Sequence, residues 1–397
     1  MFIHQTVRRN RSEFKISSID RILWSIIIFF LVWQVFLAPY TIISNLALTC
    51  LYICNYRKLS PKERKIELAL LCGIFCLIGY SFIMQNEISL IFRFALILFF
   101  VLGAYLIRLN YKICLKRLFQ VSFLLCLFLI MAEIFLFLFG EEYAKMIRNY
   151  VQDKGIGDVY FYGFYYKVQI KGNAIIPFIY MLSYAIELFP LKCKTFFRII
   201  YLSAIFIAGN FAYLLAVVAF HCVVYFCNIK SYKMLYKRLF IGLVILFTIG
   251  GGIISYIDAV FEEKKDESNA MRIEQAILLL EDLSRNPITL LGGAGLGNTV
   301  DVTTHFRSYV GATYYELQVL YILNQLGLVS FLVFILVNIL FVFKYMPDTK
   351  IKMVYAGYIL YAVTNPYIID TNQVVVIITL LSAQYQISNH LPSIWKK

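Results

Sequence analysis

Residues 88–107 read ISLIFRFALILFFVLGAYLI, an apolar run whose only charged residue is Arg93. A helix needs about 20 such residues to cross the ~30 Å hydrocarbon core of a bilayer, where lipid offers no partner to an unpaired backbone group. Similar runs recur along the chain. Hydrophobic residues make up 61% of its 397 residues, against roughly 45–50% in a soluble domain. The sequence therefore predicts an all-α polytopic membrane protein.

We expect about twelve membrane-spanning helices, forming a single domain over residues 1–397. Two apolar stretches are too long for one upright helix but too short for two helices of full length. We therefore interpret each as a tight hairpin of two short helices. Pro39 and the Gly209-Asn210 pair supply their turns. The expected spans lie near residues 22–38, 40–55, 66–84, 88–107, 118–139, 173–189, 196–209, 211–227, 239–257, 316–343, 353–369 and 372–388.

The basic residues indicate the topology of the chain. The net charge is +14, but the Lys and Arg residues cluster between the apolar runs, as cytoplasmic segments do, and the short turns expected outside carry none. The charge therefore does not point to a nucleic-acid partner. Both termini are expected in the cytoplasm, the first span is expected to remain as an uncleaved anchor, and residues 140–172 and 258–313 form two large external loops.

The second external loop carries a predicted amphipathic helix. Ile273, Ile277, Leu280 and Leu283 share one of its faces, and Arg272 lies off that stripe. Such a helix can lie on the membrane domain with its polar side toward solvent or substrate. We expect it to stop at Asn286-Pro287, because proline disfavours helix in the residue before it.

A glycine run follows, LGGAGLGN at residues 291–298, and it has two interpretations. One is a tight turn that needs positive φ angles. The other is a nest of backbone N–H groups, at Gly293 and Gly295, that binds a diphosphate.

A long helix is predicted to open after Tyr314 and Tyr315. From Glu316 to Phe343 it would measure roughly 42 Å, longer than the ~30 Å hydrocarbon core, so Glu316 should stand at the external interface. Glu316 is thus a candidate base, the alternative being an acid at a helix start that the helix dipole favours. Gly327 offers a place for this helix to bend.

Further candidates lie elsewhere on the external side. Lys167 and Lys171 belong to an aromatic, basic stretch that suits sugars and diphosphate, although such residues also populate interfaces without a ligand. Arg93 lies about five residues inside the external end of its span, where a charged residue is a functional candidate. His305 is the one external histidine, either a proton acceptor or a surface residue. The histidine positions suggest no metal site, and no cofactor is expected.

The order of these features resembles the O-antigen polymerase and O-antigen ligase superfamily of bacterial inner membranes. Asn365-Pro366 before the last span also fits. Two departures stand out. The position of the ligase histidine holds Glu316, which favours polymerase over ligase. The turn where the family often has Ser-Arg reads Gly209-Asn210, so Arg93 or Lys171 would have to supply the missing cation. The residues that carry the resemblance are Lys171-Gly172-Asn173, Arg272, Pro287, Gly293-Ala294-Gly295 and Glu316 with Gly327.

The resemblance implies a metal-independent glycosyltransferase that polymerises undecaprenyl-diphosphate-linked oligosaccharide repeat units into O-antigen for lipopolysaccharide, on the periplasmic face. Arg272, Arg93 and Lys171 would bind the diphosphate. Glu316 is the first choice of base and His305 the second, while Tyr314 and Tyr315 would line the sugar path. Expected partners are these lipid-linked oligosaccharides, the bilayer and a polysaccharide chain-length regulator.

Two alternatives stay open. An O-antigen ligase would transfer the finished glycan to the lipid A core. A lipid-linked-oligosaccharide flippase would move its substrate across the bilayer, but such transporters often show repeated halves, and no internal repeat is evident here.

Overall fold

The computed structural model describes residues 18–33, 41–154, 157–161, 165–227, 272–303, 308–309, 315 and 317–395. Every expected span that falls within these residues contains a helix, whereas the span expected at 239–257 lies outside them. By length and composition, four of the described helices could cross a membrane: Pro61–Ile83, Ile88–Leu106, Tyr111–Phe139 and Gln318–Tyr345. The chain is therefore a helical membrane protein, and the full set of twelve spans stays a prediction.

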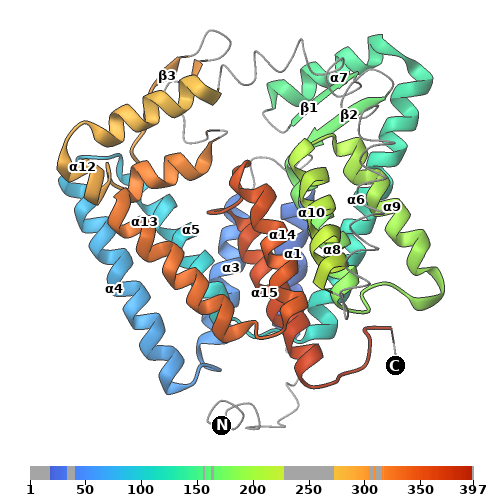
Figure 1. Cartoon of the computed structure of the whole chain (residues 1–397), viewed down its shortest axis with the longest axis horizontal. Helices are drawn as coiled ribbons and strands as arrows, with labels where there is room; N and C mark the ends of the chain where they lie inside the picture. Colours follow the sequence, from blue (N-terminus) through green and yellow to red (C-terminus); the bar gives the residue numbers. More distant parts are fainter. Residues whose placement is uncertain are drawn as a thin grey trace.

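Figure 1 shows these helices as one bundle. In chain order they are α1 (Ser18–Val32), α3 (Thr41–Tyr56), α4 (Pro61–Ile83), α5 (Ile88–Gly103), α6 (Tyr111–Phe139), α8 (Ile175–Ala185), α9 (Lys194–Ala208), α10 (Phe211–Cys227), α13 (Gln318–Tyr345), α14 (Thr349–Val363) and α15 (Thr371–Ser388). Short 3-10 helices are η1 (Ala104–Leu106), η2 (Lys171–Ala174) and η3 (Leu191–Cys193).

The core of the bundle lies around α15 and α8. Most side chains of α15 and nearly all of α8 are buried, and α15 packs against α5, α6 and α14. A helix buried on most sides needs no solvent-facing polar stripe. The outer helices α4, α6 and α13 instead expose large apolar side chains, such as Phe75, Phe137 and Leu332. Such a surface is costly in water, and lipid is the environment that it fits.

Several helices begin earlier than predicted, and at α4 and α6 polar caps extend the helix through a charged turn. The Ser60 hydroxyl accepts from the N–H of Glu63, and the Glu63 carboxylate accepts from the N–H of Ser60, so α4 starts at Pro61. The side chain of Asn110 accepts from the N–H of Ile113 and starts α6 at Tyr111. Hydrophobicity alone detects only the apolar part of such helices.

The two long polar loops have structure of their own. The first contains α7 (Glu141–Asp153) and an antiparallel hairpin of β1 (Gly157–Phe161) and β2 (Tyr166–Ile170). The second contains a helix over residues 272–284, α12 (Pro287–Gly292) and the short pair β3 (Val302–Thr303) and β4 (Ser308–Tyr309). The sequence predicted an all-α fold. The structure adds two short antiparallel strand pairs in the polar loops. Figure 1 shows the described parts of both loops at the same end of the bundle. The compartment that this end faces stays a prediction.

Candidate functional site

The glycine run folds as a buried loop against a bend in α13. Gly293, Gly295 and Gly297 have φ angles of 87°, 86° and 81°. Gly327 interrupts α13 with a φ of 67° and a ψ of 172°, which confirms the predicted bend. A Cβ atom on Gly327 would lie 2.2 Å from the backbone nitrogen of Gly293. These glycines therefore allow two backbone segments to touch.

The backbone N–H groups of the loop are used within the protein. Ala294 and Gly295 donate to carbonyls at the α13 bend over 2.8 and 3.1 Å, and Leu296 donates to the Ser81 hydroxyl over 2.7 Å. A nest for an anion needs such groups to be free, so the geometry favours the turn interpretation. Gly293 and Gly295 occupy structural positions, and a substrate contact by them stays a prediction.

The Asn86 side chain ties the loop to the end of α4. Its amide nitrogen donates to the carbonyls of Ala294 and Leu296, over 2.8 and 3.1 Å. We expect Asn86→Ala to lower the free energy of unfolding by about 1–3 kcal/mol, because two buried carbonyls lose their donor. The apparent unfolding temperature in detergent should fall accordingly. Ser89→Ala, a change at an exposed residue nearby, should leave it unchanged. Equal unfolding temperatures for Asn86→Ala and the parent would contradict this role.

The helix over residues 272–284 turns its predicted apolar stripe outward. Ile273, Ile277 and Leu280 are exposed, while Gln275 and Leu279, on the opposite side, are buried. The expected packing of the stripe on the membrane domain is therefore wrong for these three residues. Only Leu283 of the predicted stripe is buried.

Paired polar groups explain this orientation. The Asp282 carboxylate accepts from the side-chain amides of Asn324 and Asn298, over 2.8 and 3.1 Å. Leu279 packs beside them against Tyr321. The inner face is thus held by hydrogen bonds to α13 and to the glycine loop as well as by apolar contact. A prediction from hydrophobicity counts these polar residues as solvent-facing, because it does not know their partners.

The two predicted arginines lie on elements that meet at Tyr321. Arg93 is exposed in the second turn of α5, and its charge acts on the Tyr321 hydroxyl. The neighbouring Phe94 ring packs edge-on against Tyr321, with ring centroids 5.9 Å apart. Arg272 is also exposed and lies seven residues before Leu279, on the same helix face. Leu279 packs against Tyr321, and Arg272 lies about 10 Å farther along the helix axis. We call Arg93, Arg272 and Tyr321 the arginine cluster, because their elements meet at the Tyr321 ring.

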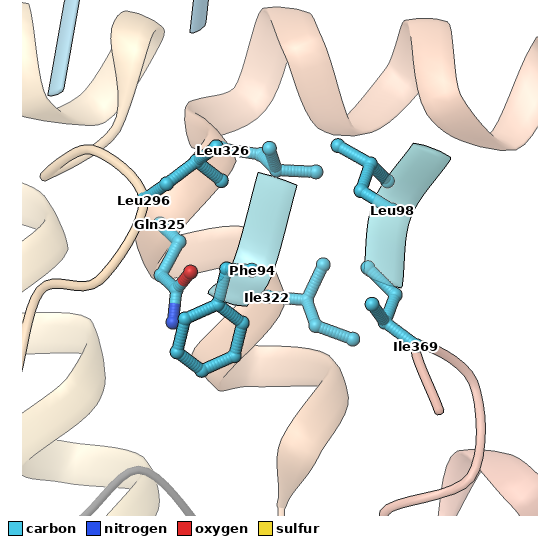
Figure 2. Close-up of a pocket in the computed structure, with 7 residues that line it drawn as sticks. All are labelled: Phe94, Leu98, Leu296, Ile322, Gln325, Leu326 and Ile369. Carbon is cyan, nitrogen blue, oxygen red and sulfur yellow. The ribbon is translucent and has the colours of Figure 1, made fainter. Parts of the chain in front are cut away.

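A small apolar pocket lies beside the arginine cluster (Figure 2). It opens between α5, α13 and the loop before α15, and Gln325 is the polar residue of its lining. Figure 2 shows the Gln325 amide beside the Phe94 ring. The volume of the pocket is about 10 Å³, which is room for one water-sized group. Its lining residues are Phe94, Leu98, Leu296, Ile322, Gln325, Leu326 and Ile369.

The predicted lysines lie at the hairpin of the first loop. Lys167 donates to the Tyr160 hydroxyl over 2.7 Å. Its stem passes over Gly209, where a Cβ atom would lie 2.4 Å from the Lys167 Cγ. Asn210 donates to the side-chain oxygen of Asn365 over 2.8 Å. The resemblance led us to expect Arg93 or Lys171 as the substitute cation at the Gly209-Asn210 turn. The structure places Lys167 there instead.

Asp370, at the N-terminus of α15, is not among the residues that the sequence predicts. Its carboxylate accepts from the Asn372 side chain. Burial raises the pKa of Asp370, while this hydrogen bond and the charge of Lys171 act in the opposite direction. Ile369, the residue before it, lines the pocket of Figure 2. Asp370 thus lies between Lys171, whose charge acts on it, and the pocket that the preceding residue lines. An acid just before an apolar helix is too common a pattern to have singled it out from the sequence.

We expect Asp370→Asn to remove a stabilising contribution that protonation of Asp370 makes in the parent on acidification. The pKa of Asp370 is higher in the folded chain than in the unfolded chain, so the ionised carboxylate costs stability above the folded pKa. Lowering the pH removes that cost in the parent but not in the variant. The measurement follows the apparent unfolding temperature as the pH is lowered stepwise from neutral through the acidic range. Glu142→Gln, at an exposed residue, should respond like the parent. An unchanged response in Asp370→Asn would refute the assignment.

The remaining predicted site residues are placed differently. Glu316, His305 and Tyr314 lie outside the described residues, and their roles stay predictions. Tyr315 is fully buried, and its hydroxyl pairs with the backbone of Val300. Burial raises the pKa of Tyr315 to about 12. Its position is that of a packing residue that holds the loop.

Within the part of the chain that the structure describes, no group of three or more His, Cys, Asp or Glu side chains could hold a metal ion. Comparisons of the chain with protein-family models, with curated proteins and with solved structures find no match. The function therefore has to be argued from the site itself.

Proposed function

We propose that this protein polymerises undecaprenyl-diphosphate-linked oligosaccharide repeat units on the external face of a bacterial inner membrane. The observation that carries the proposal is the exposed Arg93 beside Tyr321, at the end of the bundle where both polar loops lie, in a protein whose outer helices expose large apolar side chains. A lipid-borne diphosphate calls for this combination. Its oxygens need cations or hydrogen-bond donors, and its polyprenyl chain needs an apolar surface such as α4 and α13 expose.

The proposed reaction is a glycosyl transfer. A sugar hydroxyl of one lipid-linked unit attacks the anomeric carbon of the other, and the bond from that carbon to the diphosphate oxygen breaks. Undecaprenyl diphosphate leaves with the electron pair, and a base takes the proton of the hydroxyl. Glu316 remains the first choice for this base and His305 the second. Arg93 and Arg272 would stabilise the charge that develops on the leaving diphosphate.

Polymerisation needs two lipid-linked substrates at once, and two cationic groups are available for them. We assign the arginine cluster to the donor diphosphate and Lys171 to the acceptor diphosphate. Ile369 and Asp370 support this division, because the first lines the pocket and the second is the electrostatic neighbour of Lys171. Lys167, already bonded to Tyr160, would support the Gly209 turn and the hairpin.

The proposal is tested by deleting the gene in its host and resolving the lipopolysaccharide on a gel. Loss of a polymerase should leave the lipid A core carrying a single repeat unit, and the intact gene supplied in trans should restore the ladder. Bare core, with polymer still on the carrier lipid, would instead identify a ligase. An unchanged ladder would remove both functions.

A further inference from the structure

The outer surface of the second loop carries an apolar patch with no protein partner among the described residues. It consists of six side chains, three on the helix over residues 272–284 and three on α12. Their exposed fractions range from 41% for Leu290 to 67% for Ile288. We call this patch the outer stripe; its members are Ile273, Ile277, Leu280, Ile288, Leu290 and Leu291.

Contacts with α4 fix the height of the outer stripe along the bundle. The Tyr80 hydroxyl, in the last turn of α4, donates to the carbonyl of Gly293 over 2.7 Å. Gly292, the last residue of α12, packs against the same tyrosine, since a Cβ atom there would lie 3.0 Å from the Tyr80 hydroxyl. Figure 1 shows α12 directly beside the end of α4. The outer stripe therefore begins at the level where α4 ends.

The surface of α4 is apolar up to this level. Ile83, its last residue, is 78% exposed, and Phe82 and Phe75 are exposed as well. In a membrane protein this exposed surface faces lipid, because no water-facing helix keeps such a row of large apolar residues. The contacts of Tyr80 with Gly292 and Gly293 bring the outer stripe to the end of this lipid-facing surface.

We infer that the outer stripe inserts into the lipid leaflet at the external end of the bundle, at the boundary between acyl chains and headgroups. An amphipathic helix at this boundary buries its apolar face by about 5–10 Å. Here the opposite face bonds to protein through Asp282, so the helix lies between lipid and the arginine cluster. The position of the stripe at the end of the lipid-facing surface of α4 favours lipid as the occupant over a second copy of the chain. The inference needs only the membrane setting; on the proposed function, it also holds Arg272 at the level of a lipid-borne diphosphate.

The test uses tryptophan fluorescence of the full chain in phosphatidylethanolamine–phosphatidylglycerol vesicles. Ile277→Trp and Ile288→Trp probe the outer stripe on two separate elements. Ile83→Trp is the control for a lipid-facing site, and Thr299→Trp is the control for an exposed polar site in the same loop. The signal of the native Trp24, Trp33 and Trp395 is subtracted with the parent protein.

Brominated lipids should quench both outer-stripe probes as strongly as they quench Ile83→Trp. Aqueous acrylamide should quench the two probes far less than Thr299→Trp. Acrylamide quenching equal to that of Thr299→Trp would overturn the inference, because the stripe would then lie in water. Shielding from both quenchers would overturn it too, because protein would then cover the stripe. Neither readout depends on polymerase activity, so this result and the gel result can fail separately.

Discussion

Replacing Gly327 with alanine is expected to destabilise the protein more than the loss of the Asn86 side chain does. The new Cβ atom would lie 2.2 Å from the nitrogen of Gly293 and 2.4 Å from the carbonyl carbon of Gly292, both of them backbone atoms. The φ of 67° at Gly327 is also unfavourable for a residue with a side chain. The strained backbone should cost ~1–3 kcal/mol, and the overpacking a further ~1–3 kcal/mol.

Two other glycines supply matched controls. Gly73 and Gly79 lie within α4, where an added Cβ atom meets nothing within 4 Å. Alanine there should be neutral, or stabilise the helix by roughly 0.5–1 kcal/mol. The measurements are the yield of monodisperse protein in detergent and its apparent unfolding temperature. If Gly327→Ala matched Gly79→Ala in both, the close contact between the glycine loop and α13 would not exist.

The helical part of the fold was predictable because lipid imposes a simple rule on sequence. A long apolar run must be helical in a bilayer, so the positions of α5 and α13 follow from composition alone. The bend at Gly327 also follows, since glycine in an apolar helix is a natural place for one. The helix ends do not, because caps such as Ser60 and Asn110 recruit charged turns.

The polar loops were predicted less well. Composition marked residues 140–172 only as polar, although the alternating burial of Tyr166, Val168 and Ile170 is the pattern of a strand. The orientation of the helix over residues 272–284 depends on hydrogen bonds between Asp282 and two asparagines far along the chain. Such pairings are tertiary, and periodicity carries no information about them.

In the candidate site, too, some residues stand out in the sequence and others are recognised only from the tertiary structure. Arg93 stands out in sequence, because a charge inside an apolar run is costly and needs a reason. Asp370 does not stand out, since one acid before a helix is ordinary. Its significance comes from its proximity to Lys171 and from the pocket that the preceding Ile369 lines, and both come from tertiary structure.

Arg93→Ala and Arg272→Ala are each expected to lower the rate of polymer formation by about 10²–10³, the usual cost of removing one preorganised group from a developing charge. The rate is measured with purified protein in vesicles that contain lipid-linked repeat units, at equal protein levels. Arg→Lys variants should recover part of the rate, because lysine keeps the charge but loses the two-pronged hydrogen bonding.

Lys145→Ala is the control for a basic residue at the same end of the bundle. Lys145 is 71% exposed and pairs with Glu141 on α7. An exposed pair of this kind contributes ~0–1 kcal/mol, so the variant should polymerise like the parent. Parent-level rates in both arginine variants would exclude the arginine cluster as the donor site.

Combined variants separate the two assigned diphosphates. If Arg93 and Arg272 hold the same donor diphosphate, the second loss should add less than the first, because groups that act as a unit are not additive. Lys171→Ala should behave differently if it serves the acceptor. Its effect should multiply with that of Arg93→Ala, and it should weaken with rising concentration of acceptor lipid. A loss in Lys171→Ala that is unaffected by acceptor concentration, and that adds nothing to Arg93→Ala, would place all three cations on one diphosphate.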